Sequence, residues 1–250
     1  MRPDEGARRR GAQLAALVLL LVAASLAASP PPAASGSSSE RLSLYHPGVI
    51  TYYGFVEEPV PVRSSPSHRG RVVEHLGTTT ADGTSMVVEA IAETTAPRDQ
   101  WLEIHMPVLP NSRTGWIPRS ALSQLIPVRT WLIINTEHLR ASLVDSGRTV
   151  FSAPIGVGKA STPTPHGQFY VIDRLDNLGY GGQYGPLAFG TSAKSPVLTD
   201  WPGGGVVGVH GTNEPQLVPG HPSHGCIRMR NQDILRLGRL MPVGTPVTIQ

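Results

Sequence analysis

The stretch Gly205–Asn231, GVVGVHGTNEPQLVPGHPSHGCIRMRN, determines how this 250-residue chain is interpreted. It contains the only cysteine, Cys226, and three of the nine histidines, His210, His221 and His224. The thiolate is the reactive form of cysteine, and a free thiol has a pKa of about 8.5, so a nucleophilic cysteine needs a base or a cation beside it at neutral pH. The stretch therefore predicts a site of nucleophilic catalysis.

The residues before His210 indicate how that site is built. Residues 205–209 form a short apolar run that is typical of a buried strand, so we expect His210 at a strand end, followed by a tight turn at Gly211. The chain then passes through a loop with proline and glycine and returns at His224. A loop of this length can bring both imidazole rings beside Cys226.

Three interpretations of this cluster are open on the residues alone. The first is a thiol acyltransferase with Cys226 as nucleophile, His210 as proton donor and acceptor, and His224 in a supporting role. The second is a zinc site, because His210, His221, His224 and Cys226 carry side chains that bind zinc. The third is an inert envelope-binding protein in which the same side chains are structural.

A longer match separates these interpretations. Ser223-His224-Gly225-Cys226-Ile227, with His210-Gly211-Thr212 upstream, resembles the signature of the L,D-transpeptidase catalytic domain, the YkuD family. The resemblance covers roughly the last half of the chain. Many members carry Asn two residues after the cysteine, whereas this chain has Arg228, as a sizeable branch of the family does. The match favours the acyltransferase over zinc, and it implies that neither a metal nor an organic cofactor is needed.

The resemblance implies a two-step acyl transfer between peptidoglycan stem peptides. Cys226 attacks the carbonyl of the third residue of a stem tetrapeptide, and backbone N–H groups at Gly225 and Cys226 hold the oxyanion. A second stem peptide then accepts the acyl group and gives a 3→3 cross-link. The alternatives are L,D-carboxypeptidase activity with water as acceptor, attachment of a wall protein by the same chemistry, and a cell-envelope-binding protein without catalysis.

Three further residues of the motif are candidates for substrate binding: Arg228, Ser223 and Gly211. The Arg228 guanidinium can hold a carboxylate through two parallel hydrogen bonds or can lie at the surface. The Ser223 hydroxyl can contact substrate or shape the turn around it. His221 is expected to be an ordinary exposed loop residue.

Residues 1–29 have the pattern of an export signal. Arginines at positions 2, 8, 9 and 10 precede an apolar stretch over residues 14–28 that ends in small side chains. We expect a cleaved signal peptide, with an N-terminal membrane anchor as the alternative, and hence an extracytoplasmic protein of the bacterial envelope. The first ten residues contribute two of the three net positive charges, so the charge predicts no binding to nucleic acid.

Two regions separate this signal from the catalytic part. Residues 30–44 are rich in proline and serine and predict a flexible linker. Residues 45–125 contain short apolar runs separated by turn residues, which predicts a small antiparallel barrel. Around Val60–Ser65 and Thr114–Leu122 this region resembles a bacterial SH3-like domain.

The aromatic residues of residues 45–125 have two possible roles. Tyr52, Tyr53 and Phe55 are candidates for binding the wall or a partner through exposed rings. Trp101 and Trp116 are expected in the core, because large aromatic side chains usually bury most of their area.

Residues 126–250 form the predicted catalytic domain. The segments 131–134, 141–144, 149–152 and 168–172 predict strands, whereas 155–158, 162–167 and 177–196 are rich in glycine or proline and predict loops, the last one mobile and beside a groove. Residues 231–240 predict a helix with Asn231 as its N-cap. The expected fold class is mainly β: a small SH3-like barrel, then a β-rich YkuD-like catalytic domain with one short helix after the catalytic motif.

Overall fold

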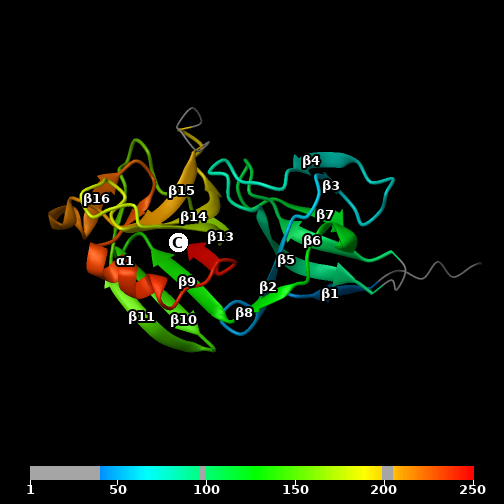
Figure 1. Ribbon diagram of the computed structural model, residues 1–250, viewed down its shortest axis with the longest axis horizontal. Helices are drawn as coiled ribbons and strands as arrows, with labels where there is room; N and C mark the ends of the chain where they lie inside the picture. The colour runs from blue at the N-terminus through cyan, green and yellow to red at the C-terminus, as the bar shows by residue number, and fades with distance from the viewer. Residues whose placement is uncertain (1–39, 96–98, 199–204) are drawn as a thin grey trace, which may run out of the picture. The chain divides into compact units, whose positions relative to one another are not determined.

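The computed structural model describes residues 40–95, 99–198 and 205–250 (Figure 1). The predicted signal segment and most of the predicted linker lie outside these residues. None of the helices that the structure describes is long and apolar enough to cross a membrane. The described chain is mainly β, as predicted, with two sheets and one α-helix among the described residues.

The first sheet has eight strands and contains the region predicted as an SH3-like barrel. Its order is β4-β3-β7-β6-β5-β2-β8, and β1 also pairs with β5. Each apolar run expected between residues 45 and 125 lies in one of its strands. These are β1 (Arg41–Ser43), β2 (Thr51–Phe55), β3 (Val60–Arg63), β4 (Val72–Leu76), β5 (Val87–Thr94), β6 (Trp101–His105), β7 (Thr114–Pro118) and β8 (Ile126–Val128), with the 3-10 helix η1 (Arg119–Ala121) after β7.

Both ends of this sheet extend past the predicted boundaries. β1 pairs with β5, so residues 41–43, which the composition assigns to the linker, are part of the sheet. β8 pairs with β2, so residues 126–128, which were predicted to begin the catalytic domain, are part of the first sheet. The pairing partners lie far away in sequence, which is why local composition does not place these two short strands.

The aromatic residues proposed for wall binding are not exposed. Tyr53 is buried at 9% exposure, and Tyr52 and Phe55 are half-buried. Trp101 is a core residue at 1% exposure, as predicted, whereas Trp116 is half-buried. Tyr53 therefore stabilises the fold and is not available to a ligand.

The second sheet has ten strands in the order β11-β10-β9-β18-β13-β14-β15-β17-β12-β16. The strands predicted over residues 131–134, 141–144, 149–152 and 168–172 are all present. The sheet comprises β9 (Thr130–Asn135), β10 (Arg140–Asp145), β11 (Arg148–Pro154), β12 (Gly156–Gly158), β13 (Gly167–Asp176), β14 (Leu187–Lys194), β15 (Val206–His210), β16 (Gly220–Ser223), β17 (Ile227–Arg228) and β18 (Pro246–Ile249), with the 3-10 helix η2 (Pro215–Leu217) before β16 and the helix α1 (Asn231–Gly238) after β17.

Three of these strands were predicted as loop. β14 lies inside the segment 177–196, and it pairs with both β13 and β15. Nearly all of its side chains are buried, so it lacks the alternation that marks a half-exposed strand. β12 lies in a glycine-rich segment, and β16 lies in the loop predicted before Cys226. They have three and four residues, and neither has an alternating pattern that would mark it as a strand.

The N-cap of the helix α1 lies one residue earlier than predicted. Its N-cap is Arg230, and Asn231 is the first helical residue, so the Asn231 capping prediction is wrong. The Asn231 side chain instead accepts a hydrogen bond from the Thr212 N–H at 2.9 Å. This contact ties the helix to the segment that follows His210.

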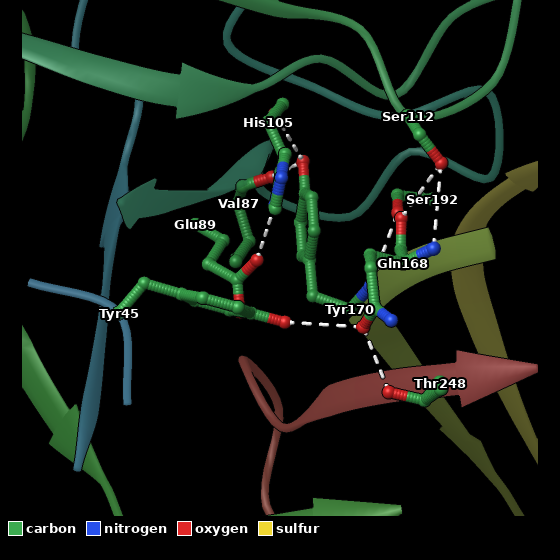
Figure 2. Close-up of polar contacts among 9 residues, drawn as sticks. All are labelled: Tyr45, Val87, Glu89, His105, Ser112, Gln168, Tyr170, Ser192 and Thr248. Carbon is green, nitrogen blue, oxygen red and sulfur yellow. Dashed lines mark hydrogen bonds and ion pairs between the residues drawn. The ribbon is translucent and has the colours of Figure 1, made fainter. Parts of the chain in front are cut away.

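The two sheets share a buried polar contact (Figure 2). The Tyr170 hydroxyl, on β13, lies 3.2 Å from the Val87 carbonyl and 3.3 Å from the His105 carbonyl, both in the first sheet. Beside it, Glu89 is fully buried, and its Oε2 lies 2.6 Å from His105 Nδ1. The first sheet is therefore packed on the second through specific polar groups.

Candidate active site

Two parallel strands place the predicted nucleophile and base on one face of the sheet. β15 and β17 are neighbours, with His210 opposite Arg228. Side chains alternate along a strand, so Gly208 lies on the face of β15 that carries His210, and Cys226 directly precedes β17. A Cβ on Gly208 would lie 3.8 Å from His210 Cδ2, and the Gly208 N–H donates to the Cys226 sulfur at 3.4 Å. Cys226 and His210 thus both lie against Gly208.

Both side chains line the same cavity, whose volume is about 150 Å³. Ser223, His224 and Arg228, all predicted from the motif, line it too. The rest of the wall comes from Gln183 and Tyr184 in the loop before β14, from Ser195 and Leu198 after β14, and from Gly205, Val206 and Val207 at the start of β15. The loop expected beside a groove thus contributes, but only through the residues before and after the unexpected strand β14.

His210 is held as a neutral base. Its ring is buried, and Nδ1 lies 2.5 Å from the Gly211 carbonyl. A carbonyl only accepts, so Nδ1 carries the proton and Nε2 remains as the acceptor. The pKa of His210 is lowered to about 4, chiefly by burial; the bond to Gly211 opposes this shift, and the Arg228 cation adds to it. The Tyr184 ring packs edge-on against the imidazole at 4.9 Å and covers it.

Cys226 is a half-buried thiol at rest. Burial raises the pKa of the Cys226 thiol, while the Gly208 N–H and the Arg228 cation lower it. Near neutral pH the pair is therefore a neutral thiol beside a neutral imidazole. Nucleophilic attack from this state requires a proton to pass from sulfur to His210.

The turn before Cys226 is fixed by two hydroxyl groups. Ser223 Oγ accepts from the Gly225 N–H at 3.1 Å and donates to the Cys226 carbonyl at 2.6 Å. Thr164 Oγ1 donates to the Gly225 carbonyl at 2.8 Å. Gly225 has a φ of +122°, a conformation that only glycine adopts readily. Ser223 thus shapes the turn, and the Gly225 N–H expected to hold the oxyanion is already bonded.

Arg228 is the cation of the cavity. Its side chain is 15% exposed, and Nη1 lies 2.9 Å from Glu214 Oε2. Its Nε is buried and has no hydrogen-bond partner within the described residues. Arg228 nevertheless lines the cavity, and a guanidinium is a donor suited to a carboxylate oxygen.

His224 lies at the exposed edge of the cavity, where its Nε2 is 3.0 Å from the Lys159 ammonium. An ammonium only donates, so His224 accepts through Nε2 and carries its proton on Nδ1. The Lys159 N–H also donates to the Ser223 carbonyl at 3.0 Å, which fixes the same turn from outside. His221 is exposed as predicted, though on the strand β16 and not in a loop.

Gly211 does not line the cavity formed by the described residues. It is buried, its carbonyl accepts from His210, and a Cβ there would overlap the Asn231 side chain and lie 3.0 Å from Gly185 Cα. Gly211 therefore positions the base, and its predicted role in binding substrate stays a prediction. Among the described residues, no group of three or more His, Cys, Asp or Glu side chains is placed to hold a metal ion.

Several residues of the site carry no sequence signal by which they could have been found. Tyr184 and Glu214 lie in irregular segments and reach the site through the fold. Lys159 precedes the Gly/Pro-rich segment 162–167, and Thr164 lies inside it. Asn231 was predicted as a helix cap, but its side chain binds the Thr212 N–H and does not cap its own helix.

The family model and the similar proteins all point to the same family. The model of the YkuD L,D-transpeptidase catalytic domain matches residues 129–249. A Bacillus licheniformis protein named putative L,D-transpeptidase YkuD is 36% identical over 133 residues, which are 53% of this chain and 72% of that protein. Its Bacillus subtilis counterpart is 37% identical over 124 residues, 50% of this chain and 66% of that protein.

Solved structures include similar chains. The crystal structure of an Enterococcus faecium L,D-transpeptidase mutant matches 48% of this chain at 25% identity with a TM-score of 0.37, and the match spans 49% of that chain, about half its length. An NMR structure of the catalytic domain from the E. faecium L,D-transpeptidase matches 48% of this chain and 96% of its own, with 26% identity and a TM-score of 0.36.

Proposed function

This chain belongs to the L,D-transpeptidase family of the YkuD type, and from that premise we propose that it is a peptidoglycan L,D-transpeptidase that works through a Cys226 thioester. Members of the family act on peptidoglycan in the cell envelope. The observation that carries the proposal is the placement of Cys226 and His210 against Gly208 in one cavity.

The first half of the reaction forms the thioester. The Cys226 proton passes to His210 Nε2, and the sulfur attacks the carbonyl carbon of the third residue of a stem tetrapeptide. The Cys226 N–H stabilises the oxyanion, because the Gly225 N–H is bonded to Ser223. The C–N bond then breaks, His210 returns the proton to the leaving amine, and terminal D-alanine departs.

The second half transfers the acyl group. The side-chain amine of another stem peptide attacks the thioester carbonyl, His210 takes its proton, and the thiol is released with a 3→3 cross-link formed. Arg228 holds a carboxylate of the stem peptide through its guanidinium, and His224 with Lys159 fixes the turn that carries Cys226. No metal or organic cofactor takes part in these steps.

The proposed location of the protein in the cell follows from the same proposal. Export through residues 1–29, by a cleaved signal or as an anchor, brings the second sheet to its substrate in the envelope. The first sheet is proposed to be an SH3-like relative, on the basis of its short antiparallel strands.

The experiment that tests the function uses purified protein and disaccharide tetrapeptide muropeptides, with products separated and weighed. Dimers linked 3→3, together with free D-alanine, are the expected products, and Cys226→Ala is the control. Tripeptides without dimers would make the enzyme an L,D-carboxypeptidase, and no product at all would contradict the proposal.

A further inference from the structure

A loop of the first sheet contacts the end of β14 in the second. The loop joins β6 to β7, and Asn111 lies in it. Asn111 Nδ2 donates to the Lys194 carbonyl at 2.8 Å, and the Lys194 N–H donates to Asn111 Oδ1 at 2.9 Å. One side-chain amide thus satisfies both main-chain groups of Lys194, as a neighbouring strand would.

The main chain of Lys194 determines where the cavity wall lies. Lys194 pairs with Val206 in the ladder between β14 and β15, and the next residue, Ser195, donates its N–H to the Gly205 carbonyl at 2.8 Å. Ser195, Gly205 and Val206 all line the cavity that contains Cys226. Displacement of Lys194 therefore moves three residues of the wall.

Within the second sheet, the pairing of β14 with β15 is irregular just before Lys194. The register of β14 against β15 shifts between Gly190 and Lys194, so the ladder is interrupted immediately before the wall. An interrupted ladder leaves main-chain groups without their regular partners. A second loop of the first sheet carries a charge toward the same place, because the Asp82 carboxylate opposes the lowering of the Lys194 pKa that burial causes.

We propose that Asn111 is a positioning residue for the substrate cavity. A loop of the first sheet then helps to hold the wall of the active site in place. Asn111 touches neither the reacting atoms nor the catalytic side chains. It acts through Lys194 on the wall formed by Ser195, Gly205 and Val206, which faces the bound stem peptide. His210 lies at the opposite end of β15 from Val206, and Cys226 precedes β17, so we expect the chemistry of this pair to survive replacement of Asn111.

The test compares two reactions of the same protein. Asn111→Ala raises the KM for a tetrapeptide muropeptide about tenfold, the effect of losing two neutral hydrogen bonds that hold the wall. Alkylation of Cys226 by iodoacetamide, a small reagent that needs no peptide-binding wall, changes by less than about twofold. Asn111→Asp keeps the acceptor for the Lys194 N–H but sets a carboxylate oxygen against the Lys194 carbonyl, so its KM rises at least as much as that of Asn111→Ala. Asn111→Ser, whose hydroxyl can still donate or accept, gives a smaller rise and covers the case in which the alanine variant fails to fold.

Ser112→Ala is the matched control. Ser112 lies in the same loop, and its Oγ is 3.3 Å from both the N–H and the carbonyl of Gln168, near the start of β13 (Figure 2). Gln168 is not part of the cavity wall. Ser112→Ala therefore weakens the contact between the sheets and leaves the KM unchanged. An equal rise in KM in both variants would mean a general loss of stability and would overturn the proposal.

A second measurement is independent of the proposed function. Hydrogen exchange of the Ser195 amide, which reports the bond to Gly205, becomes at least about fivefold faster in Asn111→Ala and stays unchanged in Ser112→Ala. Unchanged exchange in Asn111→Ala overturns the proposal. If the wild-type protein processes no muropeptide, the proposed function fails, and the exchange data still decide whether Asn111 positions the wall.

Discussion

The main-chain N–H of Gly208 donates a hydrogen bond to the sulfur of Cys226, at 3.4 Å. A donor of this kind favours the thiolate over the thiol, because the charged sulfur is the stronger acceptor. It comes from the strand that also carries His210, so the group that takes the proton and the group that steadies the resulting charge are fixed by one element. The following predictions test this arrangement and its surroundings.

Cys226→Ala abolishes acyl transfer, with a loss of about 10⁴-fold or more, because the chain has no second cysteine. The fold is retained, since the side chain is only half-buried. Muropeptide products weighed by mass spectrometry report activity, and thermal unfolding reports the fold. Residual 3→3 cross-linking in the alanine variant would assign the nucleophile elsewhere.

The rate of Cys226 acylation rises with pH along an acid limb near pH 4. Burial lowers the pKa of His210 to about 4, so the neutral base is present at every pH above that value. Burial raises the pKa of the Cys226 thiol, so thiolate absorbance is absent near neutral pH in the wild-type protein. kcat/KM measured from pH 3.5 to 9 checks the limb; a midpoint near the ordinary imidazole value would refute the buried-base geometry.

Replacing His210 and replacing His224 should change the acylation of Cys226 in different ways. His210→Ala removes the acid limb and nearly all acylation, because no other ring in the cavity is held with Nε2 as a free acceptor. His224→Ala weakens acylation by about tenfold through a looser turn and leaves the limb in place, since His224 contacts Lys159 at the edge. If His224→Ala alone moves the limb, their roles are reversed.

Arg228→Gln moves the acid limb of acylation to higher pH. The Arg228 cation lowers the pKa of both His210 and Cys226, so its removal raises both. The KM for a stem peptide also rises, by about tenfold, because a charged hydrogen bond to its carboxylate is lost. Arg230→Gln is the control, since Arg230 donates to the Val218 carbonyl. The same shift of the limb in both variants would exclude a local effect of Arg228.

Glu89→Gln makes the protein less sensitive to rising pH. Burial raises the pKa of Glu89 above its unfolded value, so the stability linked to its proton is full below the unfolded pKa and is lost as pH rises through the folded one. Glutamine keeps an acceptor for His105 and has no charge to lose. Glu89→Ala instead removes the partner of His105 and costs about 3–5 kcal/mol. Urea unfolding at pH 5 and pH 8 distinguishes the variants; equal pH dependence in Glu89→Gln and wild type would contradict the expectation.

The parts of the fold that sequence predicts well are those with a local cause. Alternating apolar residues predict β9, β10, β11 and β13, and the sequence motifs around Cys226 and His210 predict the site. β14 was missed because a strand buried on both faces with small residues has no alternation. Arg228's partner Glu214 and the wall residue Ser195 were missed because only tertiary pairing brings them there. The Gly225 amide was assigned to the oxyanion because the competing Ser223 hydroxyl has no signature in the chain.

The strand β18 lies in the interior of the second sheet, where it pairs with β9 in parallel and with β13 antiparallel (Figure 1). Leu132 of β9 is therefore joined to β13 only through Val247, more than a hundred residues later in the chain. Contacts of such long sequence separation form late and slow the folding of a sheet. The second sheet therefore closes only after residues 246–249 have been synthesised and have inserted between β9 and β13.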